Sequence, residues 1–128
     1  MALLEANDLE IRFGGVKALA GVSFRVEEGE VFGVIGPNGA GKTTLLNAIS
    51  AVYRLNGGSI RFAGEDVTGL PLHRLSRLGI ARTFQIVQPF KAMSVRENVA
   101  IGAMFGHARL RTRDAWLAAA DAALERTG

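Results

Sequence analysis

The sequence contains no cysteine among its 128 residues, which excludes disulfides and thiolate metal sites. No apolar run approaches the length of a membrane-spanning helix. The first residues, Met1 to Glu5, lack the basic region and the apolar core of a signal peptide. These absences together lead us to expect a soluble, cytoplasmic protein of about one small domain.

The formal net charge is +3, and most of the 15 basic residues are arginine. A basic balance can indicate nucleic-acid binding. However, the arginines are scattered from Arg12 to Arg126 among carboxylates, and no DNA- or RNA-reading motif is present. One cluster, Arg109, Arg111 and Arg113, is interpreted as a solvated or headgroup-facing loop. We therefore expect no nucleic-acid partner.

A glycine-rich segment, Gly36-Pro37-Asn38-Gly39-Ala40-Gly41-Lys42-Thr43, fits the pattern of Gly, four residues, Gly, Lys and then Ser or Thr. The glycines lack a Cβ, so they can take positive φ and let backbone N–H groups converge on phosphate oxygens. In such a loop the lysine reaches the β- and γ-phosphates, and the Ser or Thr hydroxyl can bind Mg²⁺. The segment therefore predicts nucleotide binding with Lys42 and Thr43 in these roles.

The residues on both sides of this loop support the prediction. The apolar run 31–35 is rich in β-branched residues, as expected of a buried strand. After the loop, four apolar residues recur at helical spacing and predict a helix that begins near Gly41; they are Leu45, Leu46, Ile49 and Val52. A strand, a glycine loop and a helix in that order form the context that the motif requires. The alternative is a glycine-rich turn that precedes Lys-Thr by chance.

Further elements follow from turn and cap signals. Strands are expected at 3–13, with an irregularity at Asn7-Asp8, and at 22–26, 59–62 and 80–84. Turns are expected at 14–15, 27–30, 56–58 and 63–66. One helix is expected to begin at Pro71 and stop at Gly79, and another to begin with a capping box of Ser94 and Glu97. A final helix is expected to end at Gly128 and to carry an apolar stripe of Trp116, Ala119, Ala120, Ala123 and Leu124.

Three stretches carry a resemblance to a known family: 12–19 (Arg-Phe-Gly-Gly-Val-Lys-Ala-Leu), the loop 36–44, and 69–85, which ends in Arg-Thr-Phe-Gln. Together they resemble the ATP-binding subunits of ABC transporters. The stretch 69–85 is most similar to the ATPases of branched-chain amino acid importers, because Gln85 follows Thr-Phe. Lipopolysaccharide-export ATPases share the Leu-Pro but differ around Gln85, and they remain an alternative.

This resemblance implies an α/β fold of the P-loop NTPase, ABC ATPase type. It implies residues 1–85 as a nucleotide-binding core with an antiparallel β subdomain, and 86–128 as the start of a helical subdomain. The cofactors implied are ATP and Mg²⁺. The ATP-binding residues implied are Phe13, which would stack on adenine, and Gly36, Asn38, Gly39, Ala40, Gly41, Lys42, Thr43 and Thr44. Lys42 and Gln85 would serve catalysis, and Thr43 and Gln85 would hold the metal.

For Phe13 the alternative is a core residue at a strand end, and for Gln85 it is a solvated residue. The resemblance also implies partners. A membrane permease subunit would dock on the region after Gln85, where 86–90 is apolar for a loop; a loop packed over the core is the alternative. A second ATPase subunit would complete the transporter. Docking on the permease would place the protein at the cytoplasmic face of the inner membrane.

The resemblance covers only the first half of a family domain, so we expect a truncated, catalytically incomplete piece. Nothing in 86–128 matches a Leu-Ser-Gly-Gly-Gln signature, and no apolar strand ending in Asp-Glu follows the loop. His73 and His107 do not match the family's switch histidine. A sheet that lacks strands beside 31–35 would expose an edge and favour self-association. The competing hypothesis is a stand-alone nucleotide-binding module without turnover. A P-loop kinase or GTPase is disfavoured, because no Asn-Lys-x-Asp motif is present.

Overall fold

The computed structural model describes residues 2–37, 41–83, 89–106 and 110–128. Two compact units are present, Met1–Leu72 and His73–Gly128, and each is described by itself. The first contains β1 (Ala2–Phe13), β2 (Val16–Glu27), α1 (Lys42–Ile49), β3 (Gly57–Phe62) and β4 (Glu65–Asp66). The helices that follow are α2 (Leu72–Leu78), α3 (Val95–Phe105) and α4 (Arg113–Thr127).

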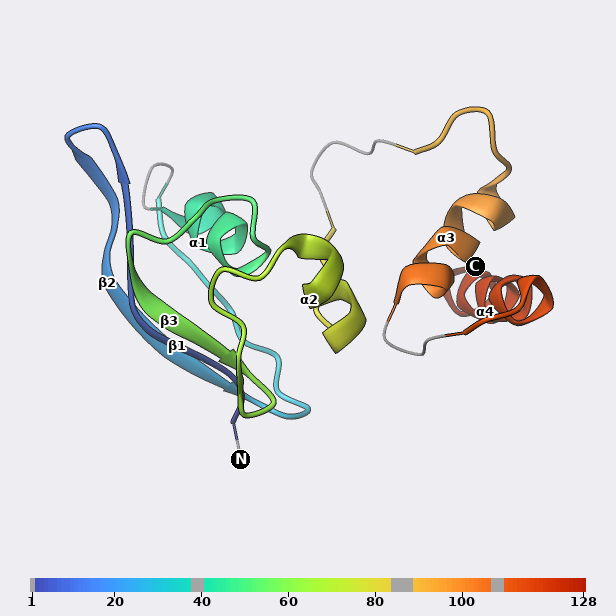
Figure 1. The fold of residues 1–128 in the computed structure, drawn as a ribbon, viewed down its shortest axis with the longest axis horizontal. Helices are drawn as coiled ribbons and strands as arrows, with labels where there is room; N and C mark the ends of the chain where they lie inside the picture. The colour runs from blue at the N-terminus through green and yellow to red at the C-terminus, as the bar shows by residue number, and fades with distance from the viewer. Residues whose placement is uncertain (1, 38–40, 84–88, 107–109) are drawn as a thin grey trace. The chain divides into compact units, whose positions relative to one another are not determined.

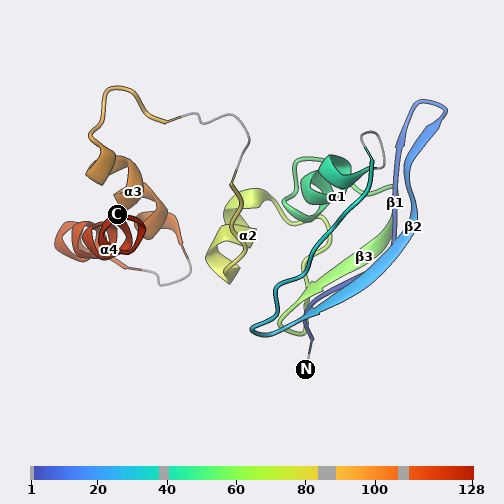
Figure 2. The same cartoon turned by 180° about the vertical axis from the view of Figure 1, so that it is seen from behind.

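The first unit is built on a four-stranded sheet in the order β2-β1-β3-β4, and every pair of neighbours is antiparallel. β1 and β2 form a long curved hairpin (Figure 1) that turns at Gly14-Gly15, as predicted. Ala6 of β1 pairs with Phe24 of β2 and with Ile60 of β3, which makes β1 a central strand. Figures 1 and 2 both place α1 on one face of this sheet.

The core of this unit lies on one face of β1 and continues into β2, β3 and α1. Its buried apolar side chains are Ala2, Ala6, Leu9, Ile11, Leu19, Leu45, Ala48, Ile60 and Val67. Leu9 and Ile11 are almost fully buried, which matches the period of two of a half-buried strand. The core therefore fixes the register of the C-terminal half of β1.

The irregularity predicted at Asn7-Asp8 is confirmed as a register shift in β1 between Ala6 and Leu9. Asp8 has a positive φ of 49°. Its backbone N–H leaves the ladder and donates to Oγ of Ser23 at 2.8 Å. This side-chain acceptor satisfies a donor that the bulge would otherwise leave without a strand partner.

The strand predicted at 31–35 is wrong. Residues 30–37 are in neither helix nor strand, and all of them are exposed. Val31 is 97% exposed and Ile35 is 96% exposed. A strand requires a neighbour for its N–H and C=O groups, and no strand in the described part of the chain pairs with this segment. The apolar pattern is therefore present without the partner that a buried strand needs.

Helix α1 begins next to Gly41, as predicted, but it ends at Ile49 and not beyond Val52. Leu45 and Ala48 form its buried face against the sheet. Leu46 and Val52 of the predicted face are each 50% exposed. The prediction placed all four apolar residues on the buried face, whereas Leu45 and Ala48 are the residues that α1 buries.

The turn predicted at 63–66 is shorter than expected. Ala63 and Gly64 alone make the turn, with φ of 50° and 83°, and Glu65–Asp66 forms the short strand β4. Two successive positive φ angles suit the twist of a two-residue hairpin. β4 pairs with Arg61 and Phe62 of β3. The strand was missed because two polar residues carry no periodic signal.

The helices after the sheet follow their predicted cap signals. α2 begins directly after Pro71, and the N–H of Gly79 closes it by bonding to the Leu75 carbonyl at 3.1 Å. The strand predicted at 80–84 is wrong for 80–83, which form no strand. The N–H of Ile80 also bonds to the Leu75 carbonyl, so it still belongs to the helix end.

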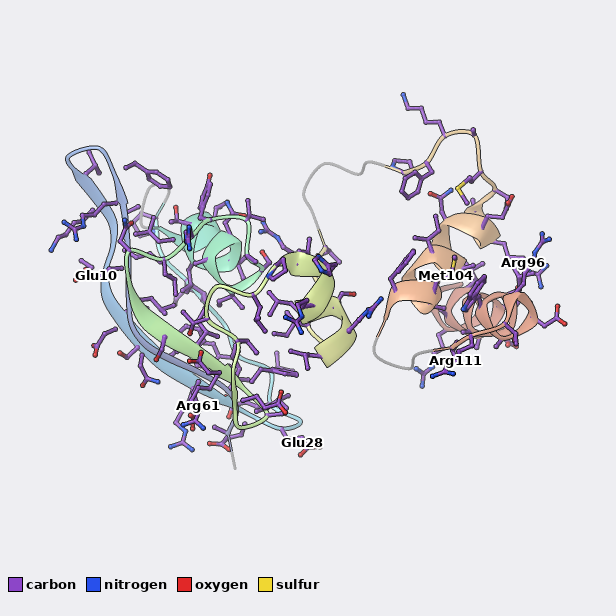
Figure 3. All side chains as sticks on the ribbon, in the orientation of Figure 1. Glu10, Glu28, Arg61, Arg96, Met104 and Arg111 are labelled. Carbon is purple, nitrogen blue, oxygen red and sulfur yellow. The ribbon has the colours of Figure 1, made fainter. Side chains whose placement is uncertain are left out.

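Helices α3 and α4 pack side by side (Figure 1). The predicted capping box is confirmed: Ser94 Oγ accepts from the N–H of Glu97 at 3.1 Å, and Glu97 Oε1 accepts from the N–H of Ser94 at 3.2 Å. Arg96 of α3 meets Asp121 of α4 through two hydrogen bonds of 2.7 and 2.8 Å; Figure 3 labels the arginine.

The predicted end of α4 at Gly128 is also confirmed. In its predicted stripe Ala120 is buried, and Trp116, Ala119 and Leu124 are half-buried, while Ala123 is exposed. In the parts of the chain that the structure describes, no helix has both the length and the apolar character to cross a membrane. The predicted division between 1–85 and 86–128 falls within 84–88, outside the described residues, and stays a prediction.

Candidate nucleotide-binding site

The phosphate-loop prediction centres on the start of α1. Gly41 is the N-cap of this helix, with a left-handed φ of 91°, and no side chain of the described residues caps it. The first helical hydrogen bond runs from the N–H of Leu45 to the Gly41 carbonyl at 2.8 Å. The N–H groups before Leu45, on residues 42–44, are therefore left without helical acceptors, and the helix dipole places partial positive charge there. This end of α1 can receive phosphate oxygens.

Gly41 is also required by close packing. A Cβ at this position would lie 2.9 Å from the carbonyl oxygen of Ala18 and 3.4 Å from Cδ2 of Leu19. Both residues belong to β2, and Leu19 is buried. The absence of a side chain at Gly41 thus lets the start of α1 lie directly against the sheet. Positive φ and lack of space both select glycine here.

Lys42 lies at the first turn of α1, and its ammonium group donates to the carbonyl oxygen of Gly36. The side chain therefore reaches back to the first glycine of the motif. Thr43 is exposed and Thr44 is half-buried on the same turn. The described part of the loop thus brings together Gly36, Gly41, Lys42, Thr43 and Thr44. Asn38, Gly39 and Ala40 lie outside the described residues.

Phe13 ends β1 and pairs with Val16 across the hairpin turn. The residue is 48% exposed and is not among the buried core residues, whereas the alternative interpretation placed it in the core at a strand end. Its ring contacts the ring of Tyr53 edge to face, with centroids 5.1 Å apart and planes at 76°. An edge-to-face neighbour covers at most one face of a ring. An exposed aromatic face is therefore available at the end of β1.

Sequence reasoning missed Tyr53 and its neighbour Asn56. Asn56 Oδ1 accepts from the N–H of Arg12 at 2.7 Å, and the N–H of Asn56 donates to the Glu10 carbonyl at 2.8 Å. These contacts join the chain after α1 to the end of β1. Tyr53 is the single tyrosine of the chain, but no periodicity or spacing links it to Phe13, which lies 40 positions away in the sequence.

The metal ligands expected were Thr43 and Gln85. In the described residues no group of three or more His, Asp and Glu side chains is placed to hold a metal ion. The predicted site would instead use one hydroxyl, phosphate oxygens and water, the oxygen ligands that Mg²⁺ prefers. The exposed Thr43 hydroxyl fits that role. Gln85 and residues 86–88 lie outside the described part of the chain.

Pro89 and Phe90 are the described residues of the predicted docking region. Phe90 is 58% exposed, although its backbone is fixed to α3. Its N–H donates to Asn98 Oδ1 at 2.8 Å, and its carbonyl accepts from Asn98 Nδ2 at 3.1 Å. Because residues 86–88 lie outside the described part of the chain, the docking region stays a prediction.

The sequence from residue 19 to residue 128 matches the ABC transporter family. The chain belongs to this family. It is 48% identical over 99 residues to the high-affinity branched-chain amino acid transport ATP-binding protein BraF of Pseudomonas aeruginosa, and the match covers 77% of the chain and 39% of BraF. It is 50% identical over 101 residues to the probable branched-chain amino acid transport ATP-binding protein LivG of Archaeoglobus fulgidus, with 79% and 39% covered.

A solved ATP-binding cassette of an ABC transporter, in its ADP conformation, superposes with a TM-score of 0.73 at 38% identity. The superposition covers 91% of the chain and 45% of that structure. The fold of this ABC chain is thus that of part of an ATP-binding cassette, with an antiparallel sheet and helices. The chain spans about two fifths of the length of the curated relatives that it matches.

Proposed function

We propose that residues 1–128 form the ATP-binding part of an ABC transporter ATPase which, as a complete subunit, couples ATP hydrolysis to import of branched-chain amino acids. The observation that carries this proposal is the start of α1. There a left-handed Gly41 packs against β2, three helix N–H groups lack helical acceptors, and Lys42 reaches over the loop. These groups offer donors and positive charge to the same phosphate oxygens.

Each site residue has a role in the proposal. The N–H groups of the loop, including those of Asn38, Gly39 and Ala40, surround the phosphates, and Lys42 exchanges the Gly36 carbonyl for β- and γ-phosphate oxygens. Thr44 contacts the α-phosphate. Thr43 and Gln85 hold Mg²⁺, which when bound neutralises charge on the phosphates. The exposed face of Phe13 stacks on adenine.

The family match begins at residue 19 and does not include Phe13. The proposed role of Phe13 is therefore argued from the position of its ring. The ring is exposed at a strand end, and β2 connects that end to the packing site of Gly41. Phe13 pairs with Val16, and Gly41 packs against Ala18, two residues further along β2. A short stretch of one strand therefore joins the proposed base platform to the phosphate loop.

The substrate and the partners come from the relatives. Both BraF and LivG are described as branched-chain amino acid transport ATP-binding proteins. We infer that this chain serves the same kind of importer, with a permease subunit docked on the region after Gln85, including the exposed Phe90. A second ATPase subunit completes the assembly, at the cytoplasmic face of the inner membrane.

We further propose that these 128 residues alone bind ATP but do not turn it over. Phosphoryl transfer to water needs a positioned water and charge stabilisation in addition to a cradle. The sequence holds neither the Leu-Ser-Gly-Gly-Gln signature nor an apolar strand ending in Asp-Glu that supply these in the family. A steady-state ATPase assay tests this point. Turnover by the 128-residue chain that Lys42→Ala abolishes would refute it.

Calorimetric titration with ATP and Mg²⁺ tests the binding proposal. Lys42→Ala is expected to weaken binding by about tenfold or more, because a charged hydrogen-bonding group to phosphate is lost. Lys91→Ala is the matched control, since Lys91 is an exposed lysine outside the loop. Equal affinity of the two variants and the wild type would show that the loop does not bind the nucleotide.

A further inference from the structure

The chain directly after α1, residues 52–56, is held at both of its ends. At the helix end, the N–H groups of Val52 and Tyr53 both donate to the Asn47 carbonyl, at 2.8 and 3.2 Å. At the strand end, Asn56 makes the two hydrogen bonds to β1 described above. We call residues 52–56 the brace. It connects the C-terminal end of α1, whose N-terminal end carries the phosphate loop, to the last residues of β1.

Tyr53, at the helix end of the brace, contacts Phe13. The two rings form the edge-to-face pair with centroids 5.1 Å apart. Glu10, which Figure 3 labels, lies on β1 three residues before Phe13. Tyr53 is 37% exposed and Phe13 is 48% exposed, so the pair lies at the surface and contributes little to the core. Because hydrogen bonds hold the backbone of the brace at both ends, Tyr53 can hold the Phe13 ring in one orientation.

We propose that Tyr53 is a positioning residue that holds the Phe13 ring for the nucleobase, so that base binding depends on the brace while phosphate binding does not. This inference rests on the proposed stacking of adenine on Phe13. Without Tyr53, the Phe13 side chain at the strand end would populate other rotamers and would lose that freedom on binding, which lowers affinity. Asn56 sets the distance by fixing the brace to Arg12, the residue before Phe13.

The brace should therefore affect the contribution of the base to nucleotide affinity and not the contribution of the phosphates. The phosphate loop contacts β2 through Gly41 and is closed by Lys42, and neither contact involves Tyr53. Loss of the Tyr53 ring should weaken a ligand that carries a base and leave a ligand without a base unchanged. A merely structural role for Tyr53 would instead weaken both ligands together.

The experiment compares ATP with inorganic tripolyphosphate, both with Mg²⁺, by calorimetry on the full 128-residue chain. Tyr53→Ala is expected to weaken ATP binding by about three- to tenfold, the size of an aromatic pair interaction. Its tripolyphosphate affinity is expected to stay within about twofold of the wild type. Tyr53→Phe keeps the ring and should restore ATP affinity. Phe105→Ala, an exposed aromatic residue of α3, is the matched control and should change neither ligand.

The outcomes separate the two proposals. If Phe13→Ala weakens ATP and Tyr53→Ala does not, the positioning role is overturned and the base platform stands. Equal weakening of both ligands by Tyr53→Ala also overturns it, as does failure of Tyr53→Phe to rescue. If Phe13→Ala leaves ATP affinity unchanged, the platform itself is wrong and the role of Tyr53 falls with it. Loss of binding in Lys42→Ala would still support the phosphate loop in that case.

Discussion

Strand β1 and segment 31–35 are both predicted from the sequence to be strands, but only β1 forms one. β1 pairs on both sides, with β2 and β3, and buries Leu9 and Ile11 almost completely. Segment 31–35 forms no strand, and Val31 and Ile35 are almost completely exposed. The difference lies in partners: β1 finds both neighbours within 62 residues of chain, and 31–35 finds none in the described residues. A strand pattern thus predicts a strand only where a neighbour is available to complete its hydrogen bonds.

Core truncation in β1 is the strongest way to test this comparison. Leu9→Ala removes a side chain with 0% exposure and is expected to cost about 2–5 kcal/mol of unfolding free energy. Val31→Ala, in the exposed segment, should stay within about 0.5 kcal/mol of the wild type. Chemical denaturation followed by circular dichroism measures both. A cost for Val31→Ala close to that of Leu9→Ala would mean that 31–35 is packed in solution.

A charge in the exposed segment should change association and leave the fold intact. The almost fully exposed Val31 and Ile35 are expected to make the wild type self-associate. Ile35→Lys should shift the chain towards monomer in a light-scattering concentration series, because a lysine disfavours burial between copies. Val95→Lys, at an exposed position of α3, is the matched control. A wild type that is monomeric at every concentration would contradict the expectation.

The capping box of α3 gives the smallest expected effect, and it tests an element that needs no distant partner. Hydrogen bonds from the backbone N–H and then the side chain of Ser94 lower the pKa of Glu97 below its ordinary 4.5. Because the folded pKa is the lower one, the contribution of Glu97 is present above the ordinary value and is lost as pH falls through the lowered pKa.

Glu97→Gln keeps an acceptor but does not titrate. From about pH 6 to about pH 3 the wild type is therefore expected to lose slightly more thermal stability than Glu97→Gln does. Differential scanning calorimetry at several pH values measures this loss. Identical pH profiles for the two proteins would show that the carboxylate does not stabilise the helix start.

The features that the sequence predicted correctly are those with local causes. The bulge at Asn7-Asp8, the stop at Gly79, the Ser94 capping box and the N-cap at Gly41 each depend on a few adjacent residues. Gly41 belongs to this group because its left-handed φ of 91° is a local backbone conformation. Family membership was equally accessible, since it rests on contiguous motifs.

The features that it did not predict depend on distant partners. The strands expected at 31–35 and 80–84 lack neighbours in the described residues, and α1 ends at Ile49, with only Leu45 and Ala48 buried. The ring contact between Tyr53 and Phe13 joins residues 40 positions apart, near the point where Asn56 bonds to Arg12 of β1. No spacing rule encodes such a contact, since it results from the fold as a whole. The roles of the individual site residues accordingly stay predictions until they are measured.

The most direct test of the central claim is a ¹H–¹⁵N NMR titration of the chain with ATP and Mg²⁺. If the start of α1 binds the phosphates, the largest shifts should be those of the amide signals of Gly41, Lys42, Thr43 and Thr44. The reason is that their N–H groups gain charged acceptors. Amides of α4 should stay in place. Shifts that spare these four residues, or that are equal across the chain, would contradict the account.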